Sequence, residues 1–289
     1  MQAILAVTVP FFALVLCGYL AAQRRVLPES AIPGLNIYVL FFALPCMLFR
    51  FGSSMPFAQL IDPALIAIYA LCSLLMVAFT IVATLQRGDS GSGVDIKNAA
   101  FGALVAAFPN TGFMGVPLLV ALYGERAAGP VIGTVLIDLI VTSTLCIALA
   151  QSQRQDDAAD SSGMLAALLR SLRAAATNPL PWAIVFGALF AATGLQWPGP
   201  LAQIVKMLGD SATPVALFTI GSVLWRAGQH AHTRTPVRRY LPVALFKLLL
   251  HPLLVFGVGL AVRAAGLAVS PFGLTVLVLA AALPSAECG

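Results

Sequence analysis

Long apolar runs alternate with short polar linkers along nearly the whole chain. The pattern predicts nine membrane segments, at about 3 to 22, 31 to 51, 63 to 85, 98 to 122, 130 to 150, 179 to 196, 200 to 224, 241 to 262 and 270 to 287. Crossing some 30 Å of hydrocarbon takes an α-helix about 20 apolar residues. Because the runs are continuously apolar and do not alternate in polarity, they predict helices and not barrel strands. The expected fold is an all-α polytopic membrane protein.

Composition agrees with the pattern, since 60% of the 289 residues are hydrophobic and 9% are charged. The net charge of +5 follows from where the cations lie. More of them fall in the linkers after segments one, three, five and seven than in the opposite linkers, and Arg24 and Arg25 directly follow the first span. This bias predicts a multi-pass inner-membrane protein with a periplasmic N-terminus, so we expect the lipid bilayer, and no nucleic acid, as a partner.

An internal repeat is visible in two places. ALPCMLFRFGS (43 to 53) aligns without a gap with ATPVALFTIGS (212 to 222), and AAFPNT (106 to 111) aligns with AALPSA (281 to 286). The matches pair the second segment with the seventh and the fourth with the ninth. A repeat of five helices must enter the membrane inverted the second time. We therefore predict a first repeat at 1–150, a linker at 151–178 and an incomplete second repeat of about four helices at 179–289.

The predicted linker contains an amphipathic stretch. One helical face carries leucines and the basic residues lie away from it, a pattern typical of a helix on the cytoplasmic membrane surface. The leucines are Leu165, Leu168, Leu169 and Leu172, and the basic residues are Arg170 and Arg173.

Proline interrupts the fourth segment near the bilayer midplane. Pro109 lies about 16 Å along a helix that starts near residue 98, and proline removes an amide hydrogen and disrupts the preceding turn. Asn110, Thr111 and Gly112 are then expected to cap a second half-helix, whose amides and positive dipole end favour an anion. Pro284 and Ser285 approach from the opposite direction. The two breaks predict a substrate site at these six residues; the alternative is a kinked helix with no ligand.

Other residues in the spans are weaker candidates. Pro45 and Pro214 are predicted helix breaks, with a kink and a site as open alternatives. Asp138, and the pair Lys247 and His251 one helical turn apart, are candidates for proton coupling or for balancing an anionic substrate. Alternatively, Lys247 extends to the headgroups and Asp138 caps a neighbouring helix.

Several kinds of chemistry lack a motif. The cysteines form no CxxC pair, and no zinc-spaced histidines, paired catalytic carboxylates or serine-nucleophile motif occurs. We therefore expect no enzyme activity, no cofactor and no metal site. The expected partners are a small organic anion, a coupling proton or sodium ion, and a second copy of the chain in a homodimer. The alternative function is a sodium-coupled symporter or a cation antiporter of related fold, which predicts clustered carboxylates in the membrane, and Asp138 is the carboxylate available there.

The segments FPNTGFMGVPLL, ALPCMLF, KLLLHPLL (247 to 254) and ALPSA (282 to 286) resemble the auxin efflux carrier family, in its bacterial form. The resemblance implies ten helices in two inverted copies, broken helices four and nine that cross, and transport of small carboxylates such as auxins, malonate or malate. It places the crossover at Pro109, Asn110, Thr111, Pro284 and Ser285. The chain stops at AECG, five residues after Pro284. We therefore expect a missing last helix, and weak transport or a nonfunctional remnant is the alternative to a working carrier.

Overall fold

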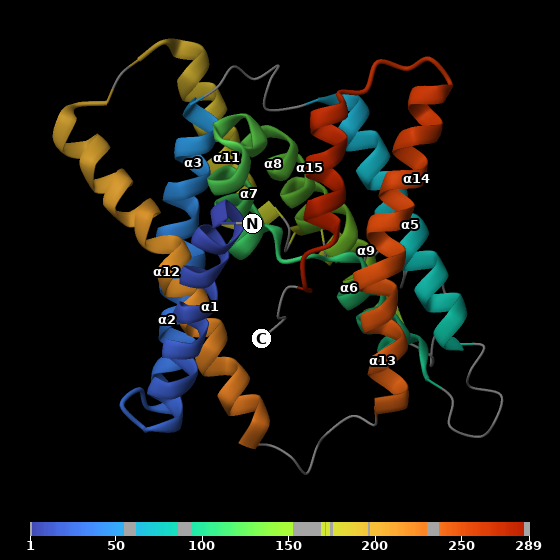
Figure 1. The fold of residues 1–289 in the computed structure, drawn as a ribbon, viewed down its shortest axis with the longest axis horizontal. Coiled ribbons are helices and arrows are strands. Elements are labelled where there is room, and N and C mark those ends of the chain that lie inside the picture. Colours follow the sequence, from blue (N-terminus) through green and yellow to red (C-terminus); the bar gives the residue numbers. More distant parts are fainter. Residues whose placement is uncertain are drawn as a thin grey trace. The chain divides into compact units, whose positions relative to one another are not determined.

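The computed structural model describes residues 2–54, 62–85, 94–152, 169–170, 172–173, 176–195, 197–229 and 237–285, and all its elements are helical. This confirms the all-α prediction (Figure 1). The α-helices are α1 Gln2–Gln23, α2 Ile32–Tyr38, α3 Leu44–Ser54, α5 Pro63–Leu85, α6 Ile96–Ala107, α7 Val116–Tyr123, α8 Ala128–Ile137, α9 Ser143–Ser152, α11 Pro179–Thr193, α12 Gly199–Gln229, α13 Val237–Leu245, α14 His251–Ala264 and α15 Pro271–Ala281. Of the predicted surface helix, Leu169, Arg170, Leu172 and Arg173 are described, and they are helical and exposed; Leu165 and Leu168 lie outside the described residues.

Five stretches among the described residues are long and apolar enough to cross a membrane: Glu29–Ser54, Pro63–Leu85, Glu125–Gln151, Gly199–Gln229 and Tyr240–Ala264. Shorter apolar helices occupy the other predicted segments. The fourth segment yields two of these, Ile96–Ala107 and Thr111–Tyr123, because the chain between them is not helical. The helices therefore lie in the predicted segments, and the fourth is divided at the predicted proline.

In the described part of the chain, four π-helical turns directly precede α-helices: Val39–Ala43, Thr111–Gly115, Asp138–Thr142 and Phe246–Leu250. A π-turn carries one extra residue and commonly occurs at functional positions. Three of the four are followed two residues later by a proline, namely Pro45, Pro117 and Pro252. Proline lacks an amide hydrogen and its ring clashes with the carbonyl four residues earlier, so a wider preceding turn gives the ring room.

This arrangement corrects the predicted helix breaks at Pro45 and Pro214. Pro45 lies in a helical run that continues from the π-turn into α3, and Leu44 donates its amide to the Val39 carbonyl across the widened turn. Pro214 lies inside α12, which continues from Gly199 to Gln229. Neither proline ends its helix, so neither creates free helix ends.

The chain forms two compact units, and each takes helices from both halves of the sequence. The first unit comprises Met1–Leu60, Gly112–Gly129 and Pro179–Thr235; the second comprises Ile61–Thr111, Pro130–Asn178 and Pro236–Gly289. The predicted repeats are sequence halves and not compact bodies, so their boundaries stay a prediction. The two units are described separately below.

In the first unit, α1 packs along α12 (Figure 1) and α3 packs along α11. Both contacts depend on glycine. An added Cβ at Gly18 would meet the backbone of Phe218, and one at Gly187 would meet the backbone of Phe49. The alignment that pairs Ala43 with Ala212 also pairs Gly18 with Gly187 and Phe49 with Phe218. Within each helix pair, the close contact is therefore made by residues that the internal repeat relates to those of the other pair.

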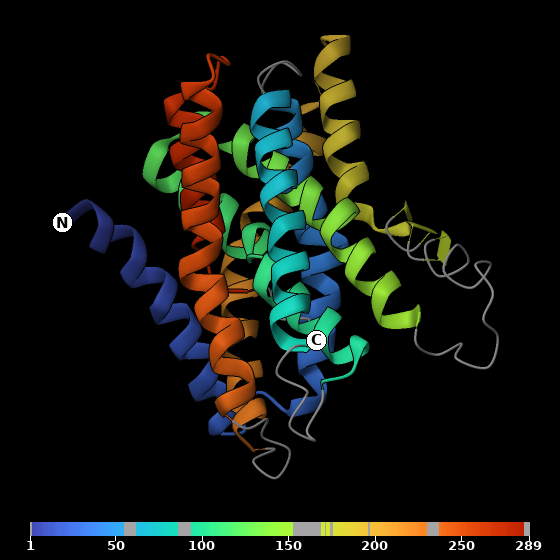
Figure 2. The ribbon, with the colours of Figure 1, turned by 90° about the vertical axis from the view of Figure 1, so that its right-hand side faces the viewer.

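In the second unit, α5 packs against different partners along its length. Near its N-terminal end, Leu65, Ile68 and Tyr69 share a buried cluster with residues of α14 and α15, and α13 and α14 form one long helical run (Figure 2). Farther along, Met76 and Val77 pack on four alanine and leucine positions of α6 and on residues of α9 and α13. The small alanines let α6 approach α5 closely. This packing brings the ends of α6 and α15 to the same part of the unit.

Candidate functional site

The predicted interruption of the fourth segment is present. Asp95 caps the start of α6 by accepting a hydrogen bond from the Asn98 amide, and α6 ends at Ala107. Phe108 is extended, with φ −105° and ψ 93°, and helical structure resumes at Thr111. A non-helical stretch of this kind within a membrane segment needs protein or water to satisfy its backbone.

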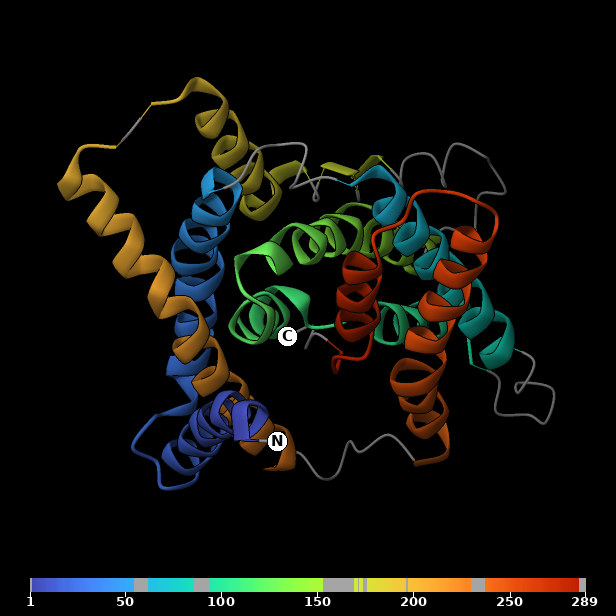
Figure 3. The ribbon, with the colours of Figure 1, turned by 45° about the horizontal axis from the view of Figure 1, so that its top comes forward.

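The two predicted breaks meet. Pro109 and Ser285 form an isolated antiparallel bridge, and the Asn110 amide donates a hydrogen bond of 2.8 Å to the Pro284 carbonyl. The chain segments that follow α6 and α15 therefore lie side by side (Figure 3). Asn110 and Thr111 are buried, at 7% and 1% exposure.

One detail of the prediction is corrected. The amides of Asn110 and Thr111 do not face a ligand, because they donate to the carbonyls of Pro284 and Pro109. Their hydrogen bonds instead fix the crossing geometry. The positive end of the second half-helix begins with the turn Thr111–Gly115, where an added Cβ at Gly112 would meet no described atom within 4 Å.

Asp138 lies fully buried in the π-turn between α8 and α9. Its carboxylate accepts hydrogen bonds from the Tyr69 hydroxyl at 3.0 and 3.1 Å and from the Thr111 hydroxyl at 3.4 Å, and the Thr142 side chain lies beside it. Each described donor is a hydroxyl group, so helix capping is not the role that these contacts give it. The Thr111 contact links Asp138 directly to the first break.

Lys247 lies in the π-turn before α14 and is 1% exposed. Its ammonium donates to the Ala281 carbonyl at 2.8 Å and lies 3.2 Å from His251 Nδ1. This position excludes the alternative in which Lys247 extends to the headgroups. Ala281 is the last residue of α15, so the cation sits at the negative end of that helix, where the dipole favours it.

These contacts form a chain of buried polar groups between the two breaks. Thr111 binds Asp138, Asp138 binds Tyr69, the Tyr69 ring packs on His251 with centroids 5.8 Å apart, and His251 contacts Lys247. Asp138 and Lys247 also interact electrostatically. Sequence reasoning named most of these residues but missed Tyr69, whose signal was a hydroxyl-bearing aromatic residue inside an apolar span.

A family profile described as "Membrane transport protein" matches residues 3–288. The chain belongs to this family, which includes the auxin efflux carriers. It is 28% identical to the "Putative malonate transporter" of Rhizobium meliloti (strain 1021), over 99% of this chain and 84% of that protein. It is 25% identical to the uncharacterized transporter YfdV of Escherichia coli (strain K12), over 97% and 84% of the two chains.

The family extends to plants. The carrier is 23% identical to auxin efflux carrier component 8 of Arabidopsis thaliana, over 90% of this chain and 82% of the plant protein. The resemblance drawn from the sequence motifs is thereby confirmed, and this carrier is a multi-pass membrane transporter.

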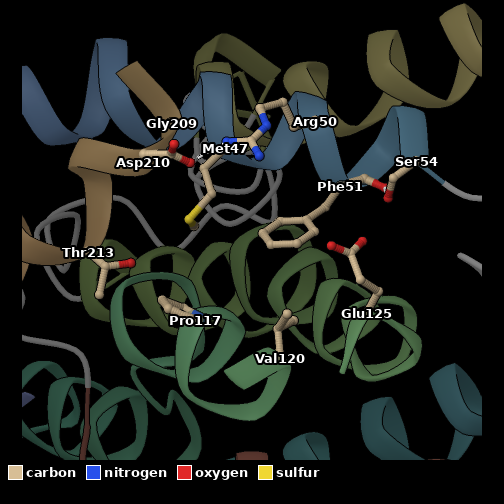
Figure 4. A pocket seen from close by; sticks show the side chains of 10 residues that line it. All are labelled: Met47, Arg50, Phe51, Ser54, Pro117, Val120, Glu125, Gly209, Asp210 and Thr213. Atoms are coloured by element: carbon tan, nitrogen blue, oxygen red, sulfur yellow. Dashed lines mark hydrogen bonds and ion pairs between the residues drawn. The ribbon is translucent and has the colours of Figure 1, made fainter. Parts of the chain in front are cut away.

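The first unit of the carrier contains a separate cavity of about 450 Å³ (Figure 4). Residues of α3, α7 and α12 line it together with Glu125: Met47, Arg50, Phe51, Ser54, Pro117, Val120, Glu125, Gly209, Asp210 and Thr213. Asp210 pairs with both Arg50 and Lys206. This cavity does not include any residue of the crossover.

Proposed function

We propose that this chain is a secondary transporter of small organic anions, mono- or dicarboxylates, and that the substrate binds where the two breaks cross. The residues of this site are Pro109, Asn110, Thr111, Gly112, Pro284 and Ser285. The observation that carries the proposal is the pairing of Pro109 with Ser285 and of the Asn110 amide with the Pro284 carbonyl. Two interrupted segments held together in this way present helix ends and a buried amide side chain in one place.

An anion suits this site for an electrostatic reason. The half-helix that begins at Thr111 presents its positive end to the crossover, and such ends attract carboxylates. The relative named as a malonate transporter supports a small carboxylate as substrate.

A proton is the coupling ion that the buried charges favour. Asp138 is a buried carboxylate with a buried cation, Lys247, in electrostatic range. A sodium ion placed at Asp138 would be repelled by that ammonium, whereas proton transfer changes the charge of the existing groups without adding another ion. Asp138, Lys247 and His251 are therefore the proposed coupling residues.

The proposed setting is the inner membrane, with the N-terminus in the periplasm and the linkers after segments one, three, five and seven in the cytoplasm. Support comes from the excess of Lys and Arg in those linkers. In this orientation α5 and the run from α8 to α9 both proceed toward the cytoplasm.

The test is uptake of radiolabelled malonate and of acetate into proteoliposomes that contain the full chain, with imposed proton or sodium gradients. We expect saturable uptake of at least one acid, driven by the proton gradient. No accumulation of either acid under any gradient would overturn the proposed function, and dependence on sodium alone would overturn the proton assignment.

The site is tested with Asn110→Ala, for which we expect at least a tenfold rise in the half-saturating substrate concentration because a buried polar contact is lost. Asn98→Ala is the matched control, since Asn98 is exposed in the first turn of α6 on the same segment. Equal, small effects of both substitutions would place the site elsewhere.

A further inference from the structure

Unsatisfied buried polar atoms concentrate in the second unit. Among the described residues, five buried side-chain atoms make no hydrogen bond to the protein: Ser73 Oγ, Thr80 Oγ1, Thr142 Oγ1, Thr144 Oγ1 and His251 Nε2. Leaving such an atom unpaired destabilises the fold, and native proteins commonly satisfy it with an internal water. Repeated occurrence in one unit points to bound water there.

Three of these atoms surround the pair formed by Asp138 and Tyr69. The Thr142 hydroxyl interacts with the Asp138 carboxylate and Ser73 with the Tyr69 hydroxyl, but neither contact has the geometry of a hydrogen bond, so both hydroxyls keep capacity for a water. The third, His251 Nε2, belongs to the ring that packs on Tyr69. Together with the carboxylate itself, they offer the two to four polar partners that an internal water requires.

The hydrogen bonds of Lys247 define the tautomer of His251. A lysine ammonium donates hydrogen bonds and accepts none, so in its contact with His251 the Nδ1 atom is the acceptor. Neutral histidine then carries its hydrogen on Nε2. This N–H group is a fully buried donor that has no acceptor among the described protein atoms.

We infer that internal water binds between His251 and Asp138, beside Tyr69 and Thr142, and that His251 relays a proton between Lys247 and Asp138 through it. The inference rests on the proposed function, because it supplies the path for the coupling proton. His251 is a relay here and does not bind the transported anion.

The transfer is balanced at every atom. Lys247 Nζ gives a proton to His251 Nδ1, while the hydrogen on Nε2 passes to the water. The water gives one of its own hydrogens to an Asp138 oxygen and remains a water molecule. Lys247 and Asp138 end neutral, and His251 ends as the other neutral tautomer. One buried charge pair is thereby removed without any net change in charge.

The groups around Asp138 allow this exchange. Its neighbouring elements contribute the titratable side chains Tyr69 and Cys72 of α5, Cys146 of α9, Lys247 of the π-turn Phe246–Leu250 and His251 of α14, while α6 has Lys97 in its first turn. Among these, Lys247 and His251 are in direct contact with each other. They are therefore the natural proton donors to Asp138.

The transport test uses His251→Asn, since the asparagine side chain retains a polar atom near the Nδ1 position for Lys247 but has nothing at Nε2. We expect proton-driven malonate accumulation to fall at least tenfold while gradient-free exchange of labelled for unlabelled malonate stays within about twofold. Thr142→Val should show the same split more weakly. Thr134→Val is its control, because Thr134 is buried one helical turn before Asp138 but bonds to the Val131 carbonyl. An equal loss of accumulation and exchange in His251→Asn would overturn the relay.

A second measurement does not depend on transport. The chain has three histidines, so His230→Gln with His232→Gln leaves His251 alone for ¹⁵N magnetic resonance in nanodiscs. We expect an unprotonated Nδ1, a protonated Nε2 and magnetisation transfer from water to the Nε2 hydrogen. The opposite tautomer, or no transfer from water, would overturn the inference even if malonate transport is confirmed. Absence of malonate exchange with the expected spectrum would instead count against the proposed function.

Discussion

The two compact units of this carrier bury different things. The first unit buries backbone against backbone at five glycines, Gly18, Gly52, Gly187, Gly209 and Gly221. Its fully buried polar side chains among the described residues, Thr219 and Ser222, donate to carbonyls of the helix backbone. The second unit buries a carboxylate, an ammonium and an imidazole, and it holds all five unsatisfied buried atoms found in the described part of the chain.

This difference separates two ways of specifying a membrane fold. Helices in lipid gain little from hydrophobic burial against each other, so close packing through small residues provides much of their association. The first unit follows that rule twice, in repeat-related contacts. Ionisable groups in the membrane are costly and usually functional, and the second unit retains three of them, Asp138, Lys247 and His251, next to the crossover. The comparison assigns stability chiefly to one unit and chemistry to the other.

The largest loss of stability is expected from a substitution that removes one of the two opposite charges in the second unit. Asp138→Asn leaves the Lys247 ammonium buried without its opposite charge, and removing one partner of a buried pair costs about 3 to 5 kcal/mol. Unfolding of the purified protein in mixed micelles, followed by circular dichroism, measures the loss. The double variant Asp138→Asn with Lys247→Met should recover at least half of it, because no unpaired charge remains. Stability of the single variant within about 1 kcal/mol of the parent would show that the two groups do not depend on each other.

The sequence predicted the arrangement of the first unit less directly than the site. Pro109 followed by Asn110 and Thr111 predicted a break in the helix, because proline and capping residues act locally. The glycine contacts were not predictable in the same way, since Gly18 and Gly187 are common residues in apolar segments and acquire meaning from the opposing helix. The aligned stretches gave the register, but which helices pack together is a tertiary property.

Other parts of the site were beyond local reasoning for similar causes. Pro45 and Pro214 have the same intrinsic defect as Pro109, yet their helices continue. Pro109 meets a second interrupted segment, where it pairs with Ser285 and the Asn110 amide binds the Pro284 carbonyl, and these long-range partners hold its break open. Lys247 illustrates the same limit. Its position in the sequence fits either a headgroup contact or a buried one, and the hydrogen bond that its ammonium donates to the Ala281 carbonyl at the end of α15 decides between them.

A smaller loss of stability is expected from a substitution at a close glycine contact in the first unit. An added Cβ at Gly221 would lie 2.8 Å from the Tyr19 amide nitrogen and nearer still to the Val15 carbonyl, so Gly221→Ala must separate α1 from α12. We expect a loss of about 1 to 3 kcal/mol, typical of overpacking. Thermal unfolding in detergent measures it. Gly228→Ala, on the same helix with no described atom within 4 Å of the added Cβ, should cost nothing by comparison. Equal melting temperatures for the two variants would contradict the role given to the close contact.

The smallest effect is expected from a charge that the first unit leaves in solvent. Asp210 pairs with Arg50 and Lys206, but its side chain is 49% exposed. Because water and salt screen exposed charges, Asp210→Asn should cost less than about 1 kcal/mol. The cost should decrease further between low and high ionic strength, in thermal unfolding measured beside Glu125→Gln, which alters another exposed carboxylate on the same cavity. If Asp210→Asn destabilised the carrier as much as Asp138→Asn, position in the membrane would not govern the cost of charge here. The number of ion pairs that a carboxylate makes, two for Asp210 and fewer for Asp138, would then explain the cost better than its burial.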